Sequence, residues 1–511
     1  MDNLQNNIGF FPQMPVCDRR LSSEISSDFT LPDYKSEIKR LLCSHAIVMP
    51  PNEYIGNGSA EINGEVLYRV LYLGADGELY NALLNDKYSI AVPLEFTVNH
   101  SNPDKVCFLP ICSVESVNAR VLGPRKLNLR SKVGCRALAF SPALHTPNTA
   151  GVHNPSSVEH LIDETHCINF VHCKSEPQLF IELVAFDSDV DSLRIIDNSA
   201  EVVIGECISS LDKINVKGDI MLKVLYCNDA LSEAPQVLNR RIPFSSVIYC
   251  EGAIPGLECM AYGHILNQNV KIEENGVTLE VEMMLHALAQ GNVAVPFVMD
   301  SYSTERLSET ESKQVHVMCA HKCANGNLTQ NDIISLDNAK IPPEAKIIDV
   351  WSKAEISQML HEKGKLVLSG KCMHQILYYF DEEYHTKNLE LPVRYELDCK
   401  NEPTQDNALC WHSTANIYST RVRTDTERLF IDCELSFAIF VQATNEIEVL
   451  ERISFGEKRE KTNGEMVICY PSKEASLWSI SKHYGESRNS IKNKNGIAEG
   501  EEAPKKKFLV I

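Results

Sequence analysis

A strand pattern headed by glycine occurs three times along this chain of 511 residues and constrains its fold more than any other feature. The copies start at Gly64, Gly218 and Gly370, which are almost evenly spaced, and each continues with alternating apolar and polar residues. Such alternation is typical of a strand with one buried face. A polar, turn-like stretch and a second strand follow every copy, and we expect the second strand to begin at a proline. These prolines are Pro93, Pro243 and Pro392.

A further strand pattern follows each copy at a similar offset, over 127–140, 277–289 and 429–440. Together these patterns predict a mainly β fold with three β-rich, sandwich-like domains of antiparallel strands. We expect the polar segments 141–157 and 301–312 to be linkers or long connections between the domains.

The last segment, 466–511, has a different pattern and predicts the order strand, helix, helix, strand. Ser476 is a typical N-cap residue in front of the first helix, in which apolar residues recur on one face. Asn495 and the glycine after it tolerate positive φ and predict the end of the second helix. Outside this segment the best helix candidate is 32–42, which precedes the first glycine-headed copy.

Charge is distributed unevenly along the chain. The whole sequence has 49 Lys and Arg against 69 Asp and Glu, whereas 466–511 has eight against five. So acidic a body repels nucleic acid, and no apolar run approaches the roughly 20 residues of a membrane-spanning helix. The basic segment either steers the chain toward an acidic partner or is simply a solvated surface. No secretory signal is visible in 1–20, so we expect a cytosolic protein.

Eighteen cysteines are scattered along the chain, and without an export signal we expect reduced, buried thiols. Two clusters combine cysteine with histidine: His166-Cys167 with His172-Cys173, and Cys319-Ala320-His321-Lys322-Cys323. Strand alternation places the two cysteines of the first set on one face and its two histidines on the other. The second set has no matching second pair of ligands at zinc-site spacing. We therefore expect ordinary strand cysteines, and we predict no metal site and no cofactor.

Signatures of catalysis are missing from the sequence. It has neither a Gly-x4-Gly-Lys-Ser/Thr phosphate loop nor a Gly-x-Ser-x-Gly elbow, and no His-Glu-x-x-His motif. The chain is therefore predicted not to be an enzyme. The tyrosines that end the three copies, Tyr72, Tyr226 and Tyr378, are explained better by core packing than by a glycan-stacking surface.

These patterns carry a family resemblance. Residues 31–42 with the glycine-headed hairpin resemble the SPOCS domain of sporulation proteins, and 466–511 resembles LysM, a small βααβ binding module. Three SPOCS repeats and a terminal LysM module resemble the SipL-like family of spore coat morphogenesis proteins. This resemblance implies domains at 28–145, 158–292, 313–446 and 466–511. Where many LysM modules have Gly-Asp-Thr, this chain has Glu474-Ala475-Ser476, which argues against the usual sugar-binding loop.

The resemblance implies a non-catalytic adaptor of spore envelope assembly, located in the mother-cell cytoplasm at the forespore surface. Its SPOCS repeats are expected to form a scaffold, while its LysM module docks onto a basal coat-layer ATPase and other coat proteins. Expected partner-binding residues of the module are Lys473, Glu474, Ser476, Trp478, Asn495 and Ile497. Trp478 has the alternative role of a core residue. The competing hypothesis is a protein that binds peptidoglycan or another N-acetylglucosamine polymer through LysM.

Overall fold

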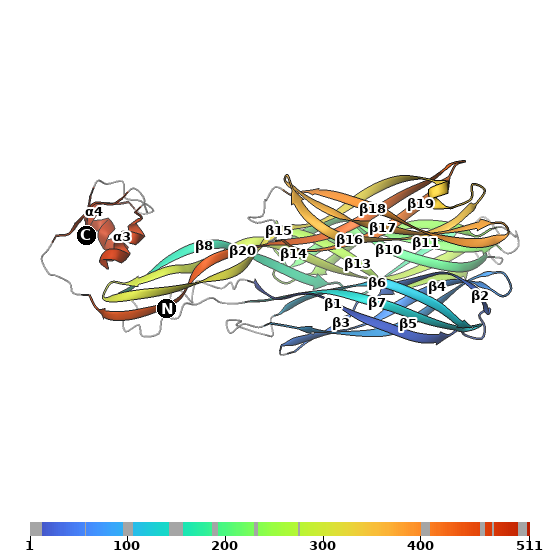
Figure 1. Ribbon diagram of the computed structural model, residues 1–511, viewed down its shortest axis with the longest axis horizontal. Helices are drawn as coiled ribbons and strands as arrows, with labels where there is room; N and C mark the ends of the chain where they lie inside the picture. Colours follow the sequence, from blue (N-terminus) through green and yellow to red (C-terminus); the bar gives the residue numbers. More distant parts are fainter. Residues whose placement is uncertain are drawn as a thin grey trace.

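The computed structural model describes residues 13–56, 58–95, 106–142, 157–185, 193–228, 234–273, 276–399, 409–459, 466–472, 475–498 and 508–511. In these residues the fold is mainly β, as predicted, with three short helices. A broad body of packed sheets narrows into a stalk, and the C-terminal helices lie at the tip of that stalk (Figure 1).

The first unit of the body consists of two sheets around one hydrophobic cluster, which includes the fully buried side chains of Tyr68 and Leu129. One sheet has the order β1-β7-β6; the other has the order β2-β4-β3, with β5 also paired to β4. The strands are β1 (Gln13–Thr30), β2 (Ile38–Val48), β3 (Asn52–Ile55), β4 (Ser59–Gly74), β5 (Leu79–Pro93), β6 (Cys107–Gly123) and β7 (Lys126–Pro142).

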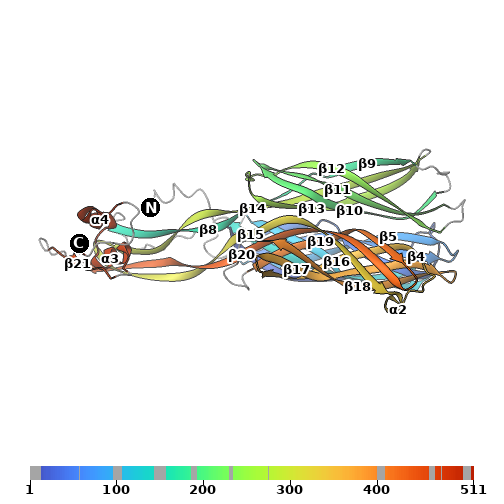
Figure 2. The same cartoon turned by 90° about the horizontal axis from the view of Figure 1, so that it is seen from above.

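The second unit is also built from two sheets around its own cluster, and it lies beside the other two units (Figure 2). Its sheets have the orders β10-β11-β12 and β13-β14-β8, with β9 paired to β14. Its strands are β8 (Val158–Lys174), β9 (Gln178–Ala185), β10 (Leu193–Ser210), β11 (Lys213–Asn228), β12 (Gln236–Tyr249), β13 (Glu258–Glu273) and β14 (Gly276–Ser303).

The third unit packs the sheets β16-β17-β18 and β15-β20-β19 around a third cluster. A one-turn helix, α2 (Leu336–Ala339), follows the first of its long strands and is capped by Ser335. The strands are β15 (Arg306–Ser335), β16 (Lys346–Glu362), β17 (Lys365–Phe380), β18 (Glu383–Asp398), β19 (Leu409–Thr424) and β20 (Arg428–Lys458).

The glycine-headed copies form the central strands β4, β11 and β17. Gly218 lies opposite a β-bulge in β10, where an added Cβ would collide with the carbonyl oxygen of Val203. A Cβ at Gly370 would collide with the Glu355 carbonyl at the corresponding bulge of β16. Glycine is therefore required for a close approach of two backbones.

Four local predictions are wrong. Pro243 and Pro392 lie inside β12 and β18 instead of at strand starts, because these are edge strands, in which a missing N–H breaks no ladder bond. Pro93 ends its strand instead of beginning one. Residues 32–42 form a turn closed by the Lys35 N–H and then β2, which pairs with β4, instead of a helix.

The predicted linker 301–312 is also wrong, since β14 continues to Ser303 and β15 begins at Arg306. The segment is polar because each strand there buries only one narrow face, so its outward residues are solvated. Most of the other predicted linker, 143–156, lies outside the described residues. The three strand patterns predicted at 127–140, 277–289 and 429–440 are confirmed as parts of β7, β14 and β20.

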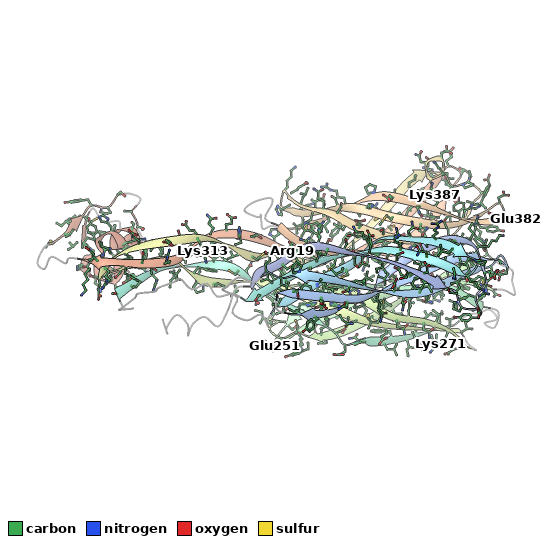
Figure 3. All side chains as sticks on the ribbon, turned by 60° about the horizontal axis from the view of Figure 1, so that its bottom comes forward. Arg19, Glu251, Lys271, Lys313, Glu382 and Lys387 are labelled. Carbon is green, nitrogen blue, oxygen red and sulfur yellow. The ribbon has the colours of Figure 1, made fainter. Side chains whose placement is uncertain are left out.

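The stalk consists of two antiparallel ribbons that extend beyond the body (Figure 1). One ribbon pairs 158–167 of β8 with 293–303 of β14, and the other pairs 306–319 of β15 with 443–458 of β20. A small cluster between them contains Phe297, and charged side chains such as Lys313 lie on the outer surface (Figure 3).

Two further clusters fasten the three units to one another. The first unites one phenylalanine from each unit, since Phe170 lies 4.8 Å from Phe140 and 6.0 Å from Phe440 between ring centroids. The second includes the buried leucines Leu71, Leu225 and Leu377 of the three central strands. The three units therefore form one packed assembly and not separate domains joined only by linkers.

Candidate docking surface of the C-terminal module

The C-terminal module consists of β21 (Ile468–Cys469), α3 (Leu477–Tyr484), α4 (Arg488–Asn495) and β22 (Leu509–Val510). Its two strands pair antiparallel, and four buried residues form its small core: Leu477, Ile480, Ile491 and Leu509. Ser476 and Ser487 cap the two helices, and a left-handed glycine ends each one. Local capping therefore defines both helices in spite of their short length.

Several residues expected to bind a partner hold the module together. The Ser476 hydroxyl accepts the N–H of Ser479 at the start of α3. The amide of Asn495 is buried and bonds to both the N–H and the C=O of Val510, which fixes β22 to α4. Ile497 packs against the module core. Lys473 and Glu474 lie outside the described residues, so a common binding surface of all six predicted residues stays a prediction.

Trp478 faces neither the module core nor solvent but packs on the stalk. Its side chain is 7% exposed, and its Nε1–H donates to Asp300 Oδ2 at 2.8 Å. Its ring makes an edge contact with Tyr302 on one side, at 5.0 Å between centroids. The guanidinium of Arg488 lies 5.1 Å from the ring centroid. The sequence offered two roles for this residue, and contact with the distant β14 was not one of them.

Opposite charges surround the tryptophan. Lys482 Nζ lies 2.7 Å from both carboxylate oxygens of Asp300, and Arg488 pairs with Glu159 at 3.8 Å. The hydroxyl of Tyr302 donates to the backbone oxygen of Glu486 at 2.7 Å. The basic character of the module thus complements acidic groups of its own stalk, an outcome that the charge pattern alone did not distinguish.

Another side of the module presents apolar side chains to solvent. We call this set the apolar edge and define it as Met466, Ile468, Tyr470 and Phe508. Tyr470 is 72% exposed and Phe508 50% exposed, with ring centroids 6.4 Å apart. Exposed aromatic groups in one patch are characteristic of protein-binding surfaces. Sequence reasoning assigned these residues only to strands, although two aromatics flanking such short strands could have drawn attention to them.

A large cavity of about 2000 Å³ lies between the three units of the body. Among the residues that the structure describes, six histidines line it: His45, His172, His264, His286, His374 and His412. Burial lowers the pKa of each; the pKa falls to about 4 for His45, His172 and His264. Cavities that enclose one small ligand measure roughly 300–1000 Å³, so these groups are spread over a wider space than such a site.

Ion pairs cross the unit boundaries beside this cavity. Arg69 of β4 lies 3.4 Å from Asp197 of β10, and Lys223 of β11 lies 2.9 Å from Asp349 of β16. In each pair, the central glycine-headed strand of one unit contacts the first strand of the corresponding sheet in the next unit. They fix the order of the units around the cavity, since each buried charge needs its own partner.

The cysteines of the two candidate clusters pack as strand residues. Cys167 lies in the stalk cluster, and Cys323 lies in the cluster that joins the units. Cys173 is partly buried against the core of the second unit.

Comparison with known proteins gives one result of consequence. Residues 191–280, which run from β10 into β14, match the family model described as SipL, SPOCS domain. Neither curated proteins nor solved structures give a match. Every helix in the described part of the chain is too short and too polar to cross a bilayer. The family match indicates a sporulation-related protein.

Proposed function

We propose that this chain is a non-catalytic scaffold and adaptor of spore envelope assembly. In this proposal all three units are SPOCS repeats, and 466–511 is a LysM module. The match over 191–280 supports the middle repeat. The other two units are supported by their central strands β4 and β17, which carry the same glycine-headed pattern in the same place as β11.

The observation that carries the proposal is the apolar edge at the tip of the stalk. The body is fastened by two inter-unit clusters and presents the module at a distance through a braced stalk. Such a spacer suits a protein that connects two layers. The exposed Tyr470 and Phe508 provide the aromatic contact that a protein partner needs.

The proposed partner is the basal coat-layer ATPase, at the forespore surface in the mother cell. The other proposed partner-binding residues of the module are Lys473, Glu474, Ser476, Asn495 and Ile497. Trp478 contributes only when the module leaves the stalk, because its indole is covered in the docked position. Peptidoglycan binding is the competing outcome.

The test is retention of the full chain on the immobilised ATPase. Replacing Tyr470 and Phe508 together with serine is expected to weaken binding about thirtyfold or more, because an aromatic at the centre of a contact typically contributes about 2 kcal/mol. The matched control replaces Leu179 and Ile181, two exposed apolar residues on β9, with serine. Equal binding by both variants would refute the docking role. Saturable retention on insoluble peptidoglycan would favour the glycan hypothesis.

A further inference from the structure

Three ligand-type side chains from distant parts of the third unit meet in the body. One candidate ligand atom each of His321, His361 and Cys399 lies within 4.8 Å of the other two. His321 and Cys399 are buried, and His361 is half-buried. We propose that these three residues bind a single Zn²⁺ ion, which is a binding site outside the proposed docking function.

The fold brings His321 to this place through a bulge. The register between β15 and β20 shifts between Ala320 and Lys322, so His321 is the extra residue of the bulge. Bulges change the direction of a side chain locally and often occur beside functional sites. The neighbouring Lys322 reaches Glu258 of the second unit at 2.8 Å, which holds this segment of β15 against the next unit.

A tight turn brings in the other two ligands. β16 and β17 are joined through Lys363 and Gly364, both at positive φ, and His361 lies near the end of β16 just before this turn. The Cys399 N–H donates to the Gly364 carbonyl at 2.9 Å, so the end of β18 is fixed to the same turn. The His361 ring nitrogen Nε2 lies 3.2 Å from the Cys399 backbone oxygen.

The distance between Cys399 Sγ and His321 Nε2 suits tetrahedral zinc. With Zn–S of about 2.3 Å and Zn–N of about 2.0–2.1 Å, the sulfur-to-nitrogen edge of the tetrahedron is roughly 3.5–3.6 Å. The observed distance from Cys399 Sγ to His321 Nε2 is 3.4 Å. One thiolate and two imidazoles are a borderline-soft set that favours Zn²⁺ over Mg²⁺ or Ca²⁺. Three protein ligands leave the fourth position for water or an external ligand.

Binding there would join β15, the β16–β17 turn and the end of β18. These segments belong to the two different sheets of the third unit, so the ion would act as a cross-brace between sheets. It would lie beside the Lys322–Glu258 contact with the second unit. The site would thus stabilise the body and leave the module untouched.

The experiment uses the full chain, reduced and freed of metal, titrated with Co²⁺ as a spectroscopic probe and then with Zn²⁺. We expect one ion per chain, a thiolate-to-cobalt charge-transfer band, displacement of Co²⁺ by Zn²⁺, and a higher melting temperature with zinc. Cys399→Ser should abolish the charge-transfer band. His361→Asn should weaken binding by more than about a hundredfold, because loss of an outer-shell partner alone costs about 10–100-fold.

The matched control is Cys433→Ser. Cys433 lies 3.9 Å from both ring nitrogens of His374, but in the described residues this pair is not part of a three-ligand group. The control should keep the band and the affinity. Circular dichroism checks that Cys399→Ser is folded. Because His361 is only half-buried, His361→Asn is a second variant with less risk to folding. Absence of stoichiometric binding, or a band that persists in folded Cys399→Ser, would overturn the proposal.

Discussion

The body and the C-terminal module are held in place by different kinds of contact. The units of the body share two buried hydrophobic clusters, and buried ion pairs cross their boundaries. The module meets the stalk through one half-buried carboxylate, Asp300, one tryptophan and a few polar groups. Apolar burial scales with area and resists separation, whereas a few polar contacts exchange readily with water. We therefore expect the body to stay together and the module to separate from the stalk more readily.

The largest expected effect is on the junction of the units. Phe440→Ala should destabilise the whole body by about 3–5 kcal/mol, because it removes a fully buried ring at the point where three units meet. Denaturant unfolding measures the change. Phe430→Ala on the same strand, where the ring lies between Arg423 and Arg428 at the surface, should cost much less. Separate unfolding of the units at their own midpoints in the unsubstituted chain would contradict a shared junction.

Gly218→Val tests the close approach inside one unit. A Cβ there meets the Val203 carbonyl, so we expect a loss of about 3 kcal/mol in the free energy of unfolding. Gly205→Val, on the bulge opposite, is the control, because a Cβ there meets its nearest atom at 3.6 Å. Equal melting temperatures for the two variants would show that the bulge yields easily.

Acid should weaken the body before it weakens the module. The pKa values of His45, His172 and His264 are lowered to about 4, below the ordinary value of about 6.5, so the unfolded chain takes up protons first. Stability should therefore fall as the pH drops from about 6.5 to about 4. Thermal melts across this range measure it, and His172→Phe should flatten the curve. His316→Gln, at an exposed position, should not.

The smallest effect concerns the module. Asp300→Ala removes the partner of both Trp478 and Lys482 and should weaken docking by about 1–3 kcal/mol, with little change in the unfolding of the body. Hydrogen exchange in α3 should rise. Asp163→Ala, an exposed acid on the neighbouring stalk strand, should leave exchange in α3 unchanged. Unchanged exchange in both variants would mean that the module is held by other contacts.

Local patterns predicted the strands well because alternation records which face is buried. The glycine-headed strands show this alternation. The helix caps at Ser476 and Asn495-Gly496 were likewise predictable, because a cap depends on residues that are close together in sequence. Contacts between residues far apart in sequence leave no such periodic signal. For this reason the sequence did not indicate that Trp478 meets Asp300 or that His321 meets Cys399. The sequence predicts a linker at 301–312, where the structure has the stalk ends of β14 and β15, because polar outward residues resemble those of a loop.

The most direct test of the adaptor proposal is the location of a chain that lacks 466–511 in sporulating cells. Because the module contributes no residue to the clusters that join the units, the shortened protein should remain folded and soluble. We expect it to lose its recruitment to the forespore surface and to spread through the mother cell, while the full chain forms a shell around the forespore. A shortened protein that still encircles the forespore would contradict the role of the module as the anchor.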